Sequence, residues 1–189
     1  MSAVNRDEAW ELLHEYTKSA SLIKHMLAIE AAMRAYGRKF GEDEELWGMT
    51  GLLHDFDYER WPNPNLDETE HPFTGVKILR EKGYPDEMLE AILGHAEYSG
   101  VERKTNLAKA LFAVDELCGF IMAVAYVRPD NLGGMKPKSV KKKLKDKAFA
   151  AKVSREDIRK GIEELGLDES EHIAFCIEAM QGVAGELGF

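Results

Sequence analysis

The adjacent residues His54 and Asp55 are the first candidates for chemistry, because imidazole and carboxylate groups together bind divalent transition metals. The pair ends the apolar segment LWGMTGLLHD, so both side chains are expected to start from a position that faces the core. His25 lies inside a second apolar segment, and Asp115 lies in the most hydrophobic stretch of the chain. These four residues are candidate metal ligands; the alternative for each histidine is a core side chain held by hydrogen bonds.

A carboxylate at position 115 needs a positive partner. The positions three and four residues away, where a partner on the same helix face would stand, hold Leu111, Phe112, Cys118 and Gly119. A buried, unpaired carboxylate is costly, so it requires a cation, a hydrogen-bond network or a raised pKa. The compensating charge therefore comes from a metal ion or from a Lys or Arg of another segment, and both remain open at this point.

The order of these residues resembles that of the HD superfamily of metal-dependent phosphohydrolases. In that family the metal is held by a His on one helix, a His-Asp doublet that ends a later helix, and an Asp on a long core helix. His25, the His54-Asp55 doublet and Asp115 follow this order, with spacings of 29 and 60 residues. The resemblance covers about residues 20–127 and implies an HD-type helical bundle that binds a divalent metal.

Two further histidines, His71 and His95, lie between the doublet and the last aspartate and resemble the additional ligands of the two-metal branch of the superfamily. The resemblance implies that Asp55 bridges two ions and is the catalytic carboxylate, and that His71 and His95 bind the second ion. The complete set of implied metal ligands is His25, His54, Asp55, His71, His95 and Asp115. Such ligands suit divalent Fe, Mn, Co, Ni or Zn.

The chain also departs from the family pattern. Tyr58 stands three residues after Asp55, where many members have a Lys that contacts substrate phosphate, and the tripeptide GYP at 83–85 precedes the last histidine instead of following it. Cleavage of a cyclic dinucleotide is therefore poorly supported. Asp57 and Glu59 are groups that support the ligands, groups that handle protons, or simple loop acids.

The resemblance implies a phosphohydrolase that uses metal-activated hydroxide on a phosphate ester, with a nucleotide or dinucleotide as the expected substrate. The alternatives are an HD-type diiron oxygenase and a non-catalytic, metal-bearing protein that binds a ligand. Arg128 and Lys136, which follow the Asp115 segment, are the candidates for substrate binding.

Charge is distributed unevenly along the chain. Residues 135–160 contain 11 Lys or Arg and 3 Asp or Glu, whereas the rest carries a net charge of −17. The densest part, 136–147, is either an electrostatic patch that attracts an anionic substrate or a solvated helix face. The whole chain has a net charge of −9, which argues against general nucleic-acid binding because phosphate neutralisation needs an excess of Lys and Arg.

Nearly every segment shows helical periodicity, and none alternates long enough to predict a strand, which indicates an all-α fold. The expected helices span residues 6–17, 21–37, 42–55, 72–82, 85–97, 104–127, 137–149, 154–165 and 169–186. Glycines that stand where helices are expected to end are Gly37, Gly41, Gly83, Gly100 and Gly166. The length predicts one domain, 1–189, with an HD-type metal-binding core at 20–127 and a C-terminal helical extension at 128–189.

The composition, 44% hydrophobic and 31% charged residues, excludes a disordered tail or a collagen-like chain. Cys118 and Cys176 show no CxxC spacing and are expected to be core side chains in a reducing compartment. The segment 107–127 approaches membrane length but contains two central acids, so a buried helix is expected. Residues 1–16 lack a signal-peptide pattern, and we therefore expect a cytoplasmic protein without membrane contact. The family resemblance implies that its partner is a small phosphorylated substrate.

Overall fold

A computed structural model describes residues 5–189 and shows an assembly of α-helices, with no strand in that part of the chain. The helices are α1 (Arg6–Tyr16), α2 (Ala20–Phe40), α3 (Glu44–Leu53), α4 (Phe73–Glu81), α5 (Asp86–His95), the 3-10 helix η1 (Glu97–Ser99), α6 (Asn106–Tyr126), α7 (Pro137–Leu144), α8 (Arg155–Leu165), α9 (Glu169–Gln181) and α10 (Ala184–Leu187). The predicted all-α fold is confirmed. Residues 1–4, where the segment considered for a signal peptide begins, lie outside the described part.

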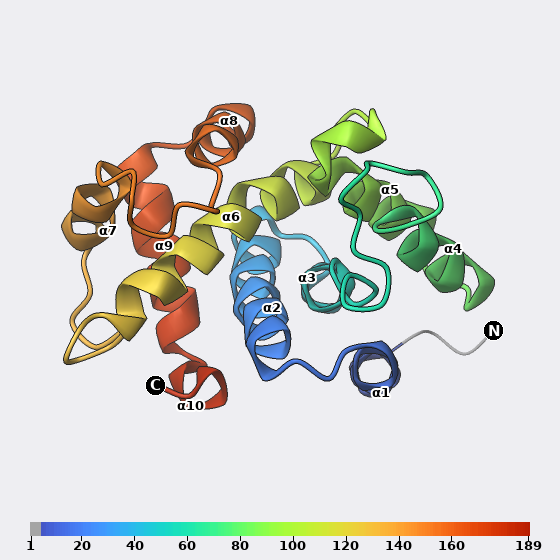
Figure 1. The fold of residues 1–189 in the computed structure, drawn as a ribbon, viewed down its shortest axis with the longest axis horizontal. Helices are drawn as coiled ribbons and strands as arrows, with labels where there is room; N and C mark the ends of the chain where they lie inside the picture. Colours follow the sequence, from blue (N-terminus) through green and yellow to red (C-terminus); the bar gives the residue numbers. More distant parts are fainter. Residues whose placement is uncertain (1–4) are drawn as a thin grey trace.

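Helix α6 is the centre of the fold (Figure 1). It crosses the molecule, with α4 and α5 toward one end and α7 and α9 toward the other, and α2, α5, α8 and α9 pack against it. Of its 21 residues 14 are buried, so α6 is the buried helix expected for this segment. Ile158 of α8 and Ile173 of α9 belong to the same hydrophobic core, so the core extends from α6 into the residues after 128.

Side-chain caps and glycines set several helix ends. Asp43 caps α3 and Ser154 caps α8 with oxygens that accept N–H groups of the first turn. Gly41, with φ 70°, ends α2 in the left-handed conformation that glycine adopts most easily. The prediction that α2 ends near Gly37 is wrong: that glycine is helical and lets α3 approach, since a Cβ atom there would lie 3.2 Å from the Trp47 side chain.

The basic helix α7 is shorter than expected, because it ends at Leu144 instead of residue 149. The Asp146 carboxylate accepts two backbone N–H groups of the turn that follows. Arg155 donates to four backbone carbonyl groups between residues 146 and 153. These side-chain bonds stabilise a loop in place of further helical turns, and the last expected helix, 169–186, is likewise divided into α9 and α10.

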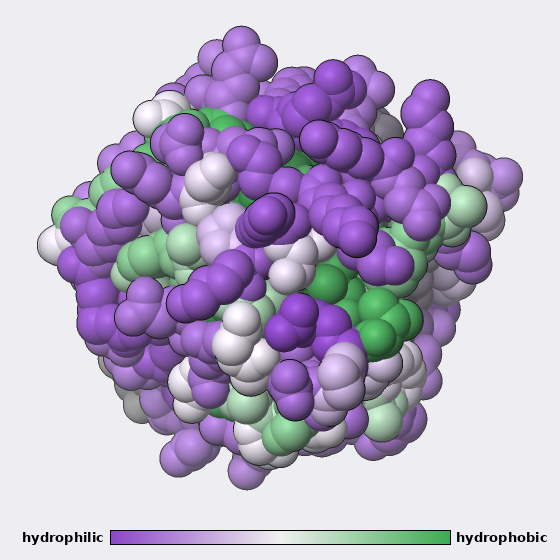
Figure 2. Space-filling model, turned by 90° about the vertical axis from the view of Figure 1, so that its left-hand side faces the viewer, coloured by the Kyte–Doolittle hydropathy of each residue, from purple (hydrophilic) through white to green (hydrophobic). Residues whose placement is uncertain are grey.

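Figure 2 shows the side of the molecule that lies at the left in Figure 1, where α7 and α9 are found. Hydrophilic side chains cover most of this face, with smaller hydrophobic areas between them. Among residues 5–189, no helix combines the length and the apolar character needed to cross a membrane.

Candidate metal centre

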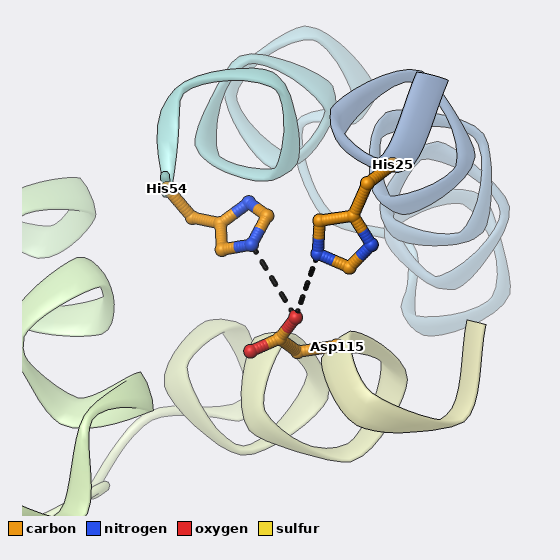
Figure 3. Close-up of side chains that lie close together, drawn as sticks. All are labelled: His25, His54 and Asp115. Carbon is orange, nitrogen blue, oxygen red and sulfur yellow. Dashed lines mark hydrogen bonds and ion pairs between the residues drawn. The ribbon is translucent and has the colours of Figure 1, made fainter. Parts of the chain in front are cut away.

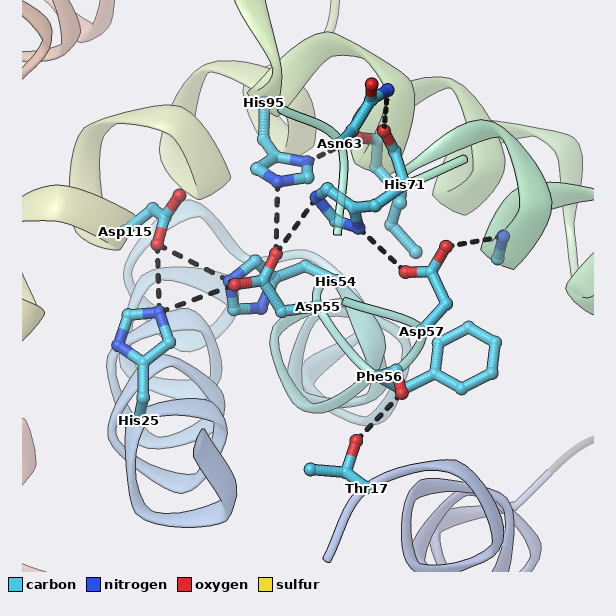
Figure 4. A network of polar contacts seen from close by, with 12 residues as sticks. Thr17, His25, His54, Asp55, Phe56, Asp57, Asn63, His71, His95 and Asp115 are labelled. Atoms are coloured by element: carbon cyan, nitrogen blue, oxygen red, sulfur yellow. Dashed lines mark hydrogen bonds and ion pairs between the residues drawn. The ribbon is translucent and has the colours of Figure 1, made fainter. Parts of the chain in front are cut away.

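Five segments bring the six predicted ligands together (Figure 4). His25 lies in α2, and the pair His54 and Asp55 lies at the end of α3. His71 precedes α4, His95 ends α5, and Asp115 lies in the middle of α6. Their possible ligand atoms form two groups, and the atoms within each group lie within 4.8 Å of one another. The first is the Asp115 group (His25, His54, Asp115), and the second is the Asp55 group (Asp55, His71, His95).

Hydrogen bonds outside the site hold the connecting segments. The Thr17 hydroxyl donates to the carbonyl of buried Phe56 at 2.8 Å, which fixes the turn that carries the His-Asp doublet. The carbonyl of His71 accepts hydrogen bonds from Asn63 Nδ2 at 2.7 Å and from the Tyr98 hydroxyl at 2.9 Å. The loop before α4 is thereby tied to the residues after α5.

In the Asp115 group, His25 and His54 each turn a ring nitrogen toward the Asp115 carboxylate (Figure 3). His25 Nε2 lies 3.1 Å from Asp115 Oδ1, and His54 Nε2 lies 3.4 Å from the same oxygen. The His54 side chain is fully buried, and its Nε2 makes no hydrogen bond. Because His54 Nδ1 is 2.8 Å from the Gly51 carbonyl, which can only accept, Nδ1 donates and Nε2 of the neutral ring keeps its lone pair. A buried lone pair that faces carboxylates fits a metal ion.

Asp55 faces both groups with different oxygens. Its Oδ1 lies 3.3 Å from His71 Nε2 and 3.3 Å from His95 Nε2. Its Oδ2 lies 3.5 Å from His54 Nε2 and 4.0 Å from His25 Nε2. One carboxylate with an oxygen toward each set of imidazoles has the arrangement needed to bridge two cations.

The carboxylates and imidazoles of the site shift one another's pKa. Burial disfavours the charged form of His54, but the Asp55 and Asp115 carboxylates outweigh burial and raise the pKa of His54. Burial also opposes ionisation of Asp115, yet His54 and His25 hold the pKa of that carboxyl well below its usual range. In the absence of a metal, a proton on His54 therefore helps to compensate the two carboxylates, and a divalent cation would take over this role.

A pocket of about 430 Å³ opens beside the two groups. Its lining includes Tyr58, Glu97, Tyr98, Glu116 and Asp157, and no Lys or Arg is among the described residues that line it. Burial and the neighbouring Asp115 raise the pKa of Glu116 to about 7. The pocket wall is therefore acidic, apart from whatever charge a metal ion contributes.

A family model described as the HD domain matches residues 22–119, just over half of the chain. The chain belongs to the HD domain family. The family indicates metal-dependent phosphohydrolases, and the matched range contains all six residues of the two groups. No curated protein and no solved structure matches the chain.

Neither Arg128 nor Lys136 lies in the pocket of this HD domain. Helix α6 continues for 11 residues beyond Asp115, about 16 Å at 1.5 Å per residue, before the chain reaches Arg128. The Arg128 guanidinium donates to two backbone carbonyls and one hydroxyl of the loop and helix that follow, and Lys136 is the exposed residue before α7. These side chains therefore hold or flank the α6–α7 connection.

Of the two neighbouring acids, only Asp57 reaches the HD-domain site. It is buried and contacts His71, whereas exposed Glu59 accepts backbone N–H groups at the start of α2. The sequence reasoning did not identify Glu116 or Asp157 as pocket residues. Glu116 follows a predicted ligand directly, which is a usable signal, but Asp157 comes from α8 and no local pattern connects it to the site.

We expect the HD domain to bind two metal ions per chain and His95→Ala to reduce this to about one, because that change removes one of two imidazoles from the Asp55 group. Elemental analysis after saturation with Mn²⁺ measures the ratio. His14→Ala is the matched control, since His14 packs on Trp10 of α1 and belongs to neither group. A wild-type maximum of one ion per chain would contradict the prediction.

Proposed function

We propose that this HD-domain protein is a hydrolase of a phosphate ester, with a nucleotide or dinucleotide as substrate, and that it uses two divalent metal ions. The observation that carries the proposal is the placement of Asp55, with one oxygen toward His71 and His95 and the other toward His54. Two divalent metals, when bound, would supply positive charge to phosphoryl oxygens and lower the pKa of bound water toward neutrality.

The chain's own residues would hold and orient the reactants. The neutral imidazoles present Nε2 to the site because Nδ1 of His54, His71 and His95 is engaged elsewhere. Glu116 lines the pocket beside Asp115, and its Oε2 accepts the Ser154 N–H at 3.0 Å. With a pKa near 7, this carboxyl suits proton transfer to a departing alcohol oxygen.

The pocket lining narrows the expected substrate. Tyr58 stands where many members of the resembled family have a Lys that contacts phosphate, and no Lys or Arg lines the pocket within residues 5–189. Arg103 and Lys160 contact the pocket residue Glu97, but both are paired with that carboxylate. A second phosphate away from the metals would therefore face acidic groups, and we expect monoesters and diesters to be better substrates than polyphosphates.

A panel of nucleotides, dinucleotides and generic phosphodiesters, assayed for phosphate or nucleoside release, tests this function. Metal-replete protein is expected to hydrolyse at least one member, and excess chelator is expected to abolish the activity. A protein with two bound metals that remains inert toward the whole panel would contradict the proposal and favour the non-catalytic alternative.

The acidic pocket lining, which contains no Lys or Arg among the described residues, also favours one alternative, a diiron oxygenase that acts on a neutral or cationic molecule. The histidine and carboxylate set suits divalent iron as well as manganese. Protein purified without oxygen and loaded with iron would then be coloured and give an EPR signal on exposure to oxygen and substrate. The hydrolase proposal requires turnover with redox-inert ions such as Zn²⁺.

The basic region offers a separate test. Within α7, Lys141 pairs with Glu169 of α9, and no α7 residue lines the pocket. If residues 136–147 attract an anionic substrate over a distance, reversing the charge of Lys141, Lys142 and Lys143 is expected to raise KM for a phosphorylated substrate at low salt. Salt weakens such attraction, because charges are screened over about 10 Å at 0.1 M. Equal KM values at low salt would show that 136–147 is a solvated surface.

A further inference from the structure

Asp57 contacts the ring nitrogen of His71 that faces away from Asp55 (Figure 4). Asp57 Oδ1 lies 2.7 Å from His71 Nδ1, while His71 Nε2 lies 3.3 Å from Asp55 Oδ1. The Asp57 side chain is only 1% exposed, so water does not compete for this contact. Because an ionised carboxylate can only accept, Nδ1 donates and Nε2 of the neutral ring keeps a lone pair toward the site.

The second oxygen of Asp57 is held by α4. Oδ2 accepts the Gly75 N–H at 2.7 Å, in the first turn of a helix whose N-cap residue, Pro72, provides no side-chain cap. A Cβ atom at position 75 would lie 2.6–2.9 Å from the Asp57 carboxylate atoms, so a side chain there would displace the carboxylate. The carboxylate therefore satisfies two buried donors and links His71 to the helix that follows it.

Asp57 differs from the groups that orient the other imidazoles. Nδ1 of His54 and of His95 donates to neutral backbone carbonyls, those of Gly51 and Ile92. A carboxylate partner fixes the tautomer and also raises the basicity of the ligating nitrogen, and the loss of such a partner typically costs 10–100-fold in metal affinity. The Asp55 group thus receives a support that the Asp115 group lacks.

We propose that Asp57 is a positioning residue that fixes His71 as a metal ligand and thereby strengthens the metal position of the Asp55 group, with little effect on the position of the Asp115 group. The inference rests on the two-metal site proposed above and does not depend on hydrolysis of a phosphate ester. It assigns to Asp57 a role in which the residue never touches the metal or the substrate.

The near-isosteric variant Asp57→Asn separates this role from simple packing. An amide has a single acceptor oxygen, so it can satisfy either the Gly75 N–H or His71 Nδ1–H but not both. If the oxygen stays with Gly75, the amide N–H₂ faces His71 and favours the tautomer in which Nε2 carries the proton and cannot ligate. The fold and the α4 cap are then retained while the metal ligand is lost.

Co²⁺ titrations measure the effect of Asp57→Asn in two variants, each of which keeps only one of the two metal positions intact. In His25→Ala, where the Asp55 group remains intact, adding Asp57→Asn is expected to weaken Co²⁺ affinity 10–100-fold. In His95→Ala, where the Asp115 group remains intact, the same addition is expected to change affinity less than about threefold. Equal losses in both backgrounds, or no loss in either, would overturn the proposal.

A second measurement does not depend on whether the His25→Ala and His95→Ala variants fold. In the metal-free wild type, the proton on His71 Nδ1 is expected to give a low-field NMR signal, because a buried carboxylate accepts it. The signal should disappear in Asp57→Asn and in Gly75→Ala, which crowds the same carboxylate. Its persistence in both variants would also overturn the proposal.

Two controls match the substitutions. Asp168→Ala removes an acidic cap from α9, so it reports the effect of losing a helix cap away from the site. Gly185→Ala adds a methyl group in α10 at a point where no atom outside the adjacent residues and the helix's own backbone lies within 4 Å. Neither control is expected to change Co²⁺ affinity or the low-field signal. A loss of Co²⁺ affinity in Asp168→Ala equal to that in Asp57→Asn would identify a general stability effect and contradict the positioning role.

Discussion

Replacing Asp55 with Ala is expected to remove both metals and to lower kcat at least a thousandfold. Asp55 has one oxygen toward each group of imidazoles, so its loss affects both metal positions at once. Metal ions supply several kcal/mol of charge stabilisation in a phosphoryl-transfer transition state, and about 4 kcal/mol corresponds to three factors of ten in rate. Elemental analysis and steady-state kinetics on the same preparation test both parts of the prediction.

The control for this change is Glu102→Ala, which removes an exposed carboxylate whose only ion-pair partner among the described residues is exposed Lys104. Metal content and kcat of the control are expected to equal those of the wild type, because exposed pairs contribute little to stability. An Asp55→Ala protein that keeps two metals per chain would show that the ions bind elsewhere.

Removal of the metals is expected to lower the melting temperature by roughly 5–10 °C for each ion removed. At 100 times Kd a bound ion stabilises the folded state by about 2.7 kcal/mol, and about 2–4 °C per kcal/mol is typical for a chain of this size. Asp115→Asn is expected to reduce the effect, because it removes a ligand and a partly buried charge that needs compensation. Melting curves with and without chelator provide the measurement.

The fall in melting temperature on chelation should grow with pH. Because the carboxylates raise the pKa of His54, the protonated ring stabilises the metal-free fold fully below about pH 6.5, and this stabilisation is lost as pH rises through the raised pKa. Metal binding needs neutral imidazole, so the metal-bound form gains over the same range. The fall in melting temperature on chelation is therefore expected to be larger at pH 8 than at pH 6. An equal fall at both values would contradict the coupling between His54 and the metals.

Much of the fold and the site could be predicted because the relevant signals are local. Helical periodicity gave the positions of the long helices, and the doublet at the end of an apolar segment placed His54 and Asp55 together at a buried helix end. The order of the remaining ligands resembled that of a known family, and the structure brings all six side chains into contact distance.

Other features depend on contacts between distant segments. Gly37 was expected to end a helix, but close packing against Trp47 of α3 explains this glycine instead. The order of residues does not show that the Arg128 guanidinium is hydrogen-bonded to carbonyl groups of its own loop. Nor does it show that Asp157 of α8 reaches the pocket. Such outcomes follow from how helices are placed around α6, which periodicity does not specify.

The central claim is a pair of metal ions bridged by Asp55, and anomalous diffraction from crystals grown with Mn²⁺ tests it most directly. We predict two anomalous peaks 3.5–4 Å apart, one beside His25, His54 and Asp115 and the other beside His71 and His95, with Asp55 between them. A single peak in metal-saturated crystals, or peaks away from Asp55, would contradict the account.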